Sequence, residues 1–169
     1  MIDPDPTEEL LAGPGAPTLA TIWATIDLGR AIRELARRGD SHDDADRSTG
    51  ETDHEAELDP ATLVLDPLLG ARVVILPPAS PDRPALAVAE PSTEGRLAAT
   101  LARQGEGPAG RYVSVADGLD LARARAMRAG IAVSRVEAGP FGPSMLVLRR
   151  PVTGPHLVLC EWSAVPSSP

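Results

Sequence analysis

The feature that most constrains this chain is an apolar strand followed by an amphipathic helix, a unit that occurs twice. The first copy reads TLATIWATIDLGRAIRELARRG from Thr18, and the second reads AGRYVSVADGLDLARARAMRAG from Ala109. In each copy an alternating apolar segment runs into a turn with Asp, and an Arg-rich helix that ends at Gly follows. Short apolar runs typical of strands come after each helix. This repetition predicts two modules of similar structure.

The expected elements define an α+β fold of two βαβββ modules whose curved mixed sheet surrounds a cleft. The first module is expected over residues 18–91, a linking helix over 92–108 and the second module over 109–162. Asp27 is expected to cap a first helix at residues 28–38, and Gly39 to end it. The remaining strands are predicted at residues 62–66, 71–78, 84–91, 111–117, 131–137, 144–150 and 156–162.

Three segments have compositions that do not suit a packed core. Residues 1–17 are rich in Pro, Gly and acidic residues and predict a flexible lead-in, with a helical turn as the one alternative near Glu8 to Leu11. Residues 40–59 hold nine of the 24 acidic residues, which predicts a disordered acidic insertion. His42 and His54 lie in it, and a solvated loop is favoured there over a cation site. Residues 163–169 are expected to form a frayed tail.

The charge distribution limits the classes of partner. The formal net charge is −8, but outside residues 40–59 the 15 acidic residues balance 15 arginines, so no basic surface for nucleic acid is expected. No apolar run reaches the length of a membrane span, and residues 1–15 lack the pattern of a signal peptide. We therefore expect a cytoplasmic protein. The absence of Lys excludes Schiff-base chemistry and a phosphate-loop lysine.

Four segments, taken in order, resemble the vicinal oxygen chelate superfamily, also called the glyoxalase/bleomycin-resistance fold. They are DPLLGARVVIL, LAVAEP, GEGPAGRYVSVAD and RPVTGPHLVLCE, and the resemblance is greatest to the methylmalonyl-CoA epimerase branch. It covers residues 18–162 apart from the acidic insertion. The resemblance implies a divalent ion held by four side chains, but the corresponding positions are Ala20, Ala87, Gly110 and Leu159. Because none of these carries a donor group, we expect a metal-independent protein without a cofactor.

Strand alternation predicts which side chains share the cavity face of the sheet. The predicted lining residues are Ala20, Ile22, Ala24, Ala87, Ala89, Gly110, Tyr112, Ser114, Leu157, Leu159 and Glu161. The small side chains among them are expected to leave room for a ring system or an acyl chain. Glu161 is the predicted general base, because desolvation beside Leu159 would raise its pKa, and Tyr112 with Ser114 is expected to hold a ligand oxygen.

Other side chains are predicted away from the cavity. Trp23 is expected on the helix-packed face, His156 at an edge or the surface, and Cys160 on the side opposite the cavity. The segment GPFGP, residues 139–143, is expected to form a turn at the cavity mouth.

The function favoured by these residues is binding of a hydrophobic or acyl small molecule, followed by an acid/base isomerisation or cyclisation. One alternative is non-catalytic binding of the drug-sequestering kind. Another is an epimerase-like metalloenzyme with atypical ligands from the insertion. A homodimer is also expected, because such modules often complete a sheet or cavity across a two-fold axis.

Overall fold

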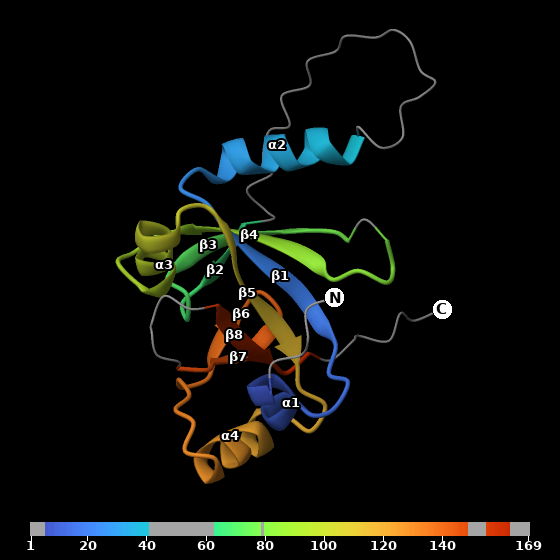
Figure 1. The fold of residues 1–169 in the computed structure, drawn as a ribbon, viewed down its shortest axis with the longest axis vertical. Helices are drawn as coiled ribbons and strands as arrows, with labels where there is room; N and C mark the ends of the chain where they lie inside the picture. Colours follow the sequence, from blue (N-terminus) through green and yellow to red (C-terminus); the bar gives the residue numbers. More distant parts are fainter. Residues whose placement is uncertain (1–5, 41–62, 79, 149–154, 163–169) are drawn as a thin grey trace, which may run out of the picture.

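Eight strands form one mixed sheet in the order β2-β3-β4-β1-β5-β8-β7-β6 (Figure 1). The structure is a computed structural model that describes residues 6–40, 63–78, 80–148 and 155–162. Predictions for residues 41–59 and 163–169, including His42 and His54, lie outside this part of the chain. The elements are α1 Pro6–Ala12, β1 Thr18–Ala24, α2 Leu28–Asp40, β2 Leu63–Asp66, β3 Ala71–Leu76, β4 Ala85–Pro91, α3 Arg96–Gln104, β5 Gly107–Ser114, α4 Leu119–Arg128, β6 Glu137–Gly139, β7 Gly142–Leu146 and β8 His156–Cys160.

The two predicted modules are confirmed, because each has the same strand pairing. In the first, β1 is parallel to β4, and in the second, β5 is parallel to β8. The modules join through the antiparallel pair β1 and β5 at the centre of the sheet. The sheet curves until its edge strands β2 and β6 contact each other, so that its inner face is almost enclosed. The fold is therefore the predicted α+β arrangement around an enclosed interior.

Helices α1, α2 and α4 cover the outer face of the sheet and bury its apolar side chains, whereas α3 packs against the inner face. Helix α2 packs Leu28, Ala31 and Ile32 against Val74 and Val88 of the first module. Figure 1 shows α2 at one end of the molecule and α1 beside α4 at the other. Trp23 lies half-buried under α2, which confirms its predicted position on the helix-packed face.

The start of α2 forms as its capping residue predicts. The backbone N–H of Arg30 donates to Asp27 Oδ1 at 2.9 Å, so that one of the unpaired N–H groups of the first turn is satisfied. The helix continues to Asp40, so Gly39 does not end it as expected. The second module also differs in its boundaries: β5 begins at Gly107, and β6 is a three-residue strand that begins at Glu137.

Helix α1 occupies part of the segment that the sequence indicated as flexible. Its side chains Leu11 and Ala12 are 0% and 1% exposed, packed in the cluster that α4 makes with the second module. Glu8 forms an ion pair with Arg111 of β5 at 2.6 Å. Two buried apolar residues are enough here because α4 supplies the opposing apolar surface, a partner that local composition does not reveal. Within the described residues, no helix has the length and apolar character needed to cross a membrane.

Candidate functional site on the inner face of the sheet

The central strands place most of the predicted lining residues on one face. Ala20, Ile22 and Ala24 of β1, Ala87 of β4 and Tyr112 of β5 belong to a single buried cluster on the inner face. Ala89 lies in the same cluster, and Ser114 is also buried, at 8% exposure. Alternation along β1, β4 and β5 therefore predicts their inner faces correctly.

The predicted orientation of β8 is wrong. Tyr112 pairs with Val158 in the parallel β5–β8 ladder, and directly paired residues point to the same face of a sheet. Val158 and Cys160 accordingly lie in the inner cluster, while Leu157 and Leu159 pack under α1 and α4. Alternation within one strand specifies two faces but not which face is the inner one, and a continuous apolar run leaves both choices open.

Glu161 lies outside the environment that was predicted for a general base. It follows the last residue of β8 and is exposed to solvent. Its backbone N–H donates to the carbonyl of Pro143 at 2.9 Å, which leaves the carboxylate beyond the buried part of the strand. The desolvation argument for Glu161 as a base therefore does not hold.

The inner face is more tightly filled than its small residues indicated. Side chains from distant segments cover the alanines: Leu69 from the turn after β2, Leu97 from α3, Phe141 from the β6–β7 turn and Leu146 from β7. Ala20 and Ala87 are each 0% exposed. Among the described residues, the space that the sequence assigns to a ligand is therefore occupied by the protein's own apolar side chains.

A buried hydrogen bond crosses this interior. The phenol of Tyr112 donates to Asp66 Oδ2 at 2.6 Å, and the two side chains are 0% and 1% exposed. The backbone N–H groups of Leu68 and Leu69 donate to Asp66 Oδ1 at 2.9 and 3.1 Å. Burial raises the pKa of Asp66 above its ordinary value, against the lowering effect of these hydrogen bonds. Burial and the neighbouring Asp66 raise the pKa of Tyr112 well above its usual range.

Sequence analysis did not identify Asp66 as a site residue. An Asp at the end of a strand and before Pro67 is typical of a turn, and its bonds to Leu68 and Leu69 fit that ordinary role. The only further signal is that the chain has a single Tyr, whose phenol requires a partner when buried. Nothing in the sequence connects that requirement to a carboxylate 46 residues away.

Cys160 also faces the interior, contrary to its predicted orientation. Its Sγ accepts a hydrogen bond from Ser144 Oγ at 3.3 Å, and the thiol is fully buried. Burial raises the pKa of Cys160 to about 12, so that the thiol stays protonated at neutral pH. This argues against a nucleophilic role, as the sequence did, although for a different reason.

His156 is a buried residue and not the predicted edge or surface residue. It is 5% exposed because β8 lies between β5 and β7, and its Nε2 shares a hydrogen bond with Thr100 Oγ1 at 2.9 Å. Burial, and secondarily the charge of Arg96, lowers its pKa. The backbone of His156 also approaches Gly110 closely: a Cβ at residue 110 would lie 2.1 Å from the His156 carbonyl oxygen.

The residues present do not fit the divalent ion that the fold resemblance implies. Ala20 and Ala87 offer no donor, Leu159 faces outward, and the backbone around Gly110 leaves no room for any side chain. In the described part of the chain, no three His, Cys, Asp or Glu side chains come together as a metal site. The alternative of ligands from the acidic insertion lies outside that part.

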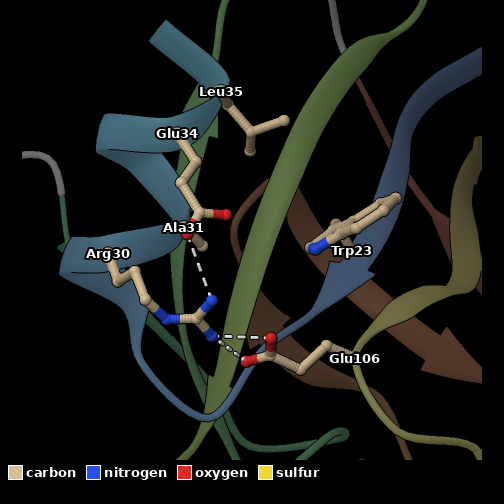
Figure 2. A pocket seen from close by; sticks show the side chains of 6 residues that line it. All are labelled: Trp23, Arg30, Ala31, Glu34, Leu35 and Glu106. Carbon is tan, nitrogen blue, oxygen red and sulfur yellow. Dashed lines mark hydrogen bonds and ion pairs between the residues drawn. The ribbon is translucent and has the colours of Figure 1, made fainter. Parts of the chain in front are cut away.

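A shallow depression lies between α2 and β1, with a cavity volume of about 50 Å³. Figure 2 shows Arg30 directed toward Glu106, with Trp23 and Leu35 on the other walls. Arg30 Nη2 lies 2.6 Å from both carboxylate oxygens of Glu106, and Nη1 lies 3.2 Å from Glu34. Because two carboxylates neutralise the guanidinium, this depression does not have the free charge of an anion site.

The fold and its strand pairing define the vicinal oxygen chelate fold, whose two βαβββ modules share one curved sheet. Among solved structures, the chain is similar to methylmalonyl-CoA epimerase from Mycobacterium tuberculosis, with a TM-score of 0.62 and 17% identity over 90% of each chain. It is also similar to a single-residue variant of Streptomyces coelicolor methylmalonyl-CoA epimerase in complex with 2-nitronate-propionyl-CoA. There the TM-score is 0.56 and the identity 20%, over 85% of this chain and 96% of the other.

A third similar structure is a methylmalonyl-CoA epimerase in complex with methylmalonyl-CoA and NH4+, with a TM-score of 0.58 and 19% identity over 91% of this chain and 99% of the other. No family model matches the sequence. No curated protein sequence matches it either. At these identities the similarity concerns the fold, and the fold alone does not assign a reaction.

Proposed function

We propose that this protein binds a hydrophobic or acyl small molecule on the inner face of its sheet and carries out a metal-independent acid/base step there. The observation that carries the proposal is the buried pair of Tyr112 and Asp66, 2.6 Å apart within an otherwise apolar cluster. A carboxyl group and a phenol in low-dielectric surroundings are groups that can move a proton and hold an oxygen. The acyl thioesters in two of the similar structures support the acyl class of ligand.

The two residues would have complementary roles in an isomerisation. Asp66, as the carboxylate, removes a proton from the carbon next to a ligand carbonyl, and the electron pair moves to the carbonyl oxygen. The Tyr112 hydroxyl, which donates to Asp66 Oδ2 in the closed protein, turns to donate its hydrogen bond to that oxygen instead. Return of the proton from Asp66 to a different carbon of a conjugated ligand completes the isomerisation, with no net change in atoms or charge, and return to the same carbon gives proton exchange only. Asp66 thus takes the role that the sequence assigned to Glu161, which is exposed.

The first test is for a ligand and for metal. Native mass spectrometry of the protein purified from its own organism is expected to show one small apolar or acyl molecule per chain. Propionyl-CoA and methyl octanoate, a neutral acyl compound, serve as probes in a thermal shift assay. Absence of an adduct together with no stabilisation by either probe contradicts the proposal, and so does a metal ion at one equivalent by elemental analysis.

The second test concerns proton transfer. Exchange of the α-protons of propionyl-CoA in D2O, followed by proton NMR, is expected with the wild-type protein and is expected to be lost in Asp66→Asn. Glu161→Gln is the matched control, because this carboxylate is exposed, and it is expected to retain exchange. Equal exchange in wild type and Asp66→Asn would contradict the acid/base role.

Non-catalytic binding is the second candidate function. It is favoured by the complete burial of Tyr112 and Asp66, which in this conformation reach no solvent. This candidate predicts stoichiometric binding of a probe without any exchange in either protein. The dimer and the cytoplasmic location stay predictions from the sequence.

A further inference from the structure

Phe141 lies in an unusual position for a residue in an exposed turn. It is the only Phe in the chain and lies between β6 and β7, where its neighbours Gly142 and Pro143 are exposed. The Phe141 side chain is only 8% exposed and belongs to the inner cluster. The turn therefore inserts one aromatic ring into the almost enclosed interior of the sheet.

The inserted ring lies between two other aromatic rings. Its centroid is 5.1 Å from that of Tyr112, with a tilt of 53°, and 5.9 Å from that of Trp162, with an angle of 75°. These are the tilted and edge-on arrangements that aromatic rings prefer, and such pairs contribute about 0.5–1.5 kcal/mol beyond apolar burial. Three of the four aromatic residues of the chain thus define a place shaped for a planar ring.

The segment that carries Phe141 is held by few hydrogen bonds. Strand β6 has three residues and pairs only with β7, at the edge of the described sheet. One of its three paired positions faces Pro143, which has no N–H to donate. Movement of this turn would therefore break little of the sheet, whereas β8 is fixed by pairing with both β5 and β7.

Phe141 packs beside the ring of Tyr112, whose hydroxyl belongs to a buried polar group. The Tyr112 hydroxyl is bonded to Asp66 Oδ2, and both N–H donors from the turn act on Oδ1. A carboxylate oxygen has lone pairs for more than one donor, so Oδ2 retains acceptor capacity. A ligand hydroxyl suits this end of the site, whereas a ligand carboxylate would face a buried acidic group without a compensating cation.

We propose that the place filled by Phe141 is an aromatic-ring subsite, and that a neutral phenol-like ligand occupies it by displacing Phe141 and directing its hydroxyl to the Tyr112–Asp66 pair. This inference rests on the proposed function and names the ligand class of the same site. The Phe141 ring is then the protein's own substitute for the ligand. Its displacement opens the inner face, which is closed in the present conformation.

The single Phe makes the test direct, because 4-fluorophenylalanine labels residue 141 alone. We expect phenol to move the fluorine resonance from its position in the folded protein toward its position in the urea-unfolded protein, in a saturable way. Cyclohexanol, with the same hydroxyl and no aromatic ring, is the matched probe and is expected to leave the resonance in place. An unchanged resonance at saturating phenol, or no saturable phenol binding by ligand-observed NMR, overturns the inference.

Two variants separate the subsite from a general apolar cavity. Trp162→Ala removes one wall, and it is expected to weaken phenol binding by about two- to tenfold, the change that loss of one aromatic contact produces. Tyr112→Phe retains the wall but removes the hydroxyl. It is expected to weaken the binding of phenol and to have little effect on the binding of toluene. Phenol binding unchanged in both variants overturns the inference.

Failure of this inference is distinguishable from failure of the proposed function. If propionyl-CoA or methyl octanoate stabilises the protein while phenol leaves the Phe141 resonance unchanged, the aromatic subsite is wrong and the small-molecule site stands. If cyclohexanol displaces Phe141 as well as phenol does, the selectivity for an aromatic ring is wrong. If no probe binds, both proposals are wrong.

Discussion

The hydroxyl of Tyr112 donates to Asp66 Oδ2 at 2.6 Å, and this bond joins β5 of the second module to the end of β2 in the first. These strands are four apart in the order of the sheet, so the bond spans the interior of the curve rather than its surface. It is a buried polar link between the modules in addition to the central β1–β5 pairing. The proposed chemistry depends on this bond.

Removal of the Tyr112 hydroxyl is expected to destabilise the fold. Tyr112→Phe retains the ring against Phe141 and leaves Asp66 with only its backbone donors, which should lower the free energy of unfolding by about 1–3 kcal/mol. Urea denaturation measures this change. The double variant with Asp66→Asn should lose less than the sum of the two single variants, because the residues share one interaction. Additive losses would show that the bond does not form in solution.

The raised pKa of Asp66 predicts how stability depends on pH. Because burial raises the pKa above its ordinary value of 3.8, the folded protein binds this proton more tightly than the unfolded chain does. The contribution of Asp66 is therefore fully present below about pH 3.8 and is lost as the pH rises through the folded pKa. Asp66→Asn should remove this decline. The measurement is the free energy of unfolding of wild type minus that of Asp66→Asn, determined at several pH values from about 3 upward. A difference that does not change with pH would contradict the prediction.

The close approach at Gly110 predicts an intolerant position. In Gly110→Ala the new Cβ would lie 2.1 Å from the His156 carbonyl oxygen, so β5 and β8 must separate locally. We expect a loss of at least about 3 kcal/mol, or no folded protein. Gly130→Ala is the control: its φ is also positive, at +67°, but no atom lies within 4 Å of the added methyl group. It should cost only about 1–2 kcal/mol. If urea denaturation gives the two variants equal losses of unfolding free energy, β8 does not lie against Gly110.

Two adjacent leucines test whether α1 belongs to the folded body. Leu11 is 0% exposed and packs in the cluster with α4, whereas Leu10 is 47% exposed. Leu11→Ala should therefore cost about 2–5 kcal/mol, as for other buried leucines. Leu10→Ala should change stability by no more than about 0.5 kcal/mol. If chemical denaturation gives the two variants the same stability, the helix is not docked.

The Glu106 carboxylate predicts a second, opposite dependence on pH. Hydrogen bonds from Arg30, then Thr25 and the Ile26 N–H, lower the pKa of Glu106 from 4.5 to about 2. Its stabilising contribution is therefore present above pH 4.5 and lost as the pH falls toward 2. Glu106→Gln should lower the melting temperature at neutral pH. It should also make the melting temperature fall less steeply as the pH is lowered below 4.5. The effect should be modest, because the pair is partly exposed and screened.

Glu34→Gln is the matched control for Glu106, because Glu34 contacts the same guanidinium through Arg30 Nη1 alone, at 3.2 Å. It should leave the fall of the melting temperature at acidic pH nearly unchanged. If Glu34→Gln and Glu106→Gln reduce this pH dependence equally, the bonds to Thr25 and Ile26 do not hold Glu106 as described.

Alternation predicted the inner face of β1 correctly but that of β8 wrongly. On β1, Ala20 and Ile22 alternate with half-buried or exposed neighbours, so the pattern of the strand itself identifies the inner face. On β8 every residue from His156 to Cys160 is buried, because β5 and β7 pair on both sides and helices cover the outer face. Such a run carries no alternating signal. Its orientation was therefore predicted one residue out of phase, and the error carried Leu157, Leu159 and Glu161 with it.

The residues alone specify the repeat of two strand-and-helix modules and the absence of donor side chains at Ala20, Ala87 and Gly110, because periodicity, capping and side-chain chemistry are properties of a few neighbouring residues. Tertiary packing decided the rest. It turned β8 so that Cys160 faces inward, brought Asp66 to Tyr112, docked α1 on α4 and placed Phe141 in the space that small side chains had left. Each of these contacts joins segments far apart in the chain, and only the register of the sheet and the curvature that it imposes bring them together.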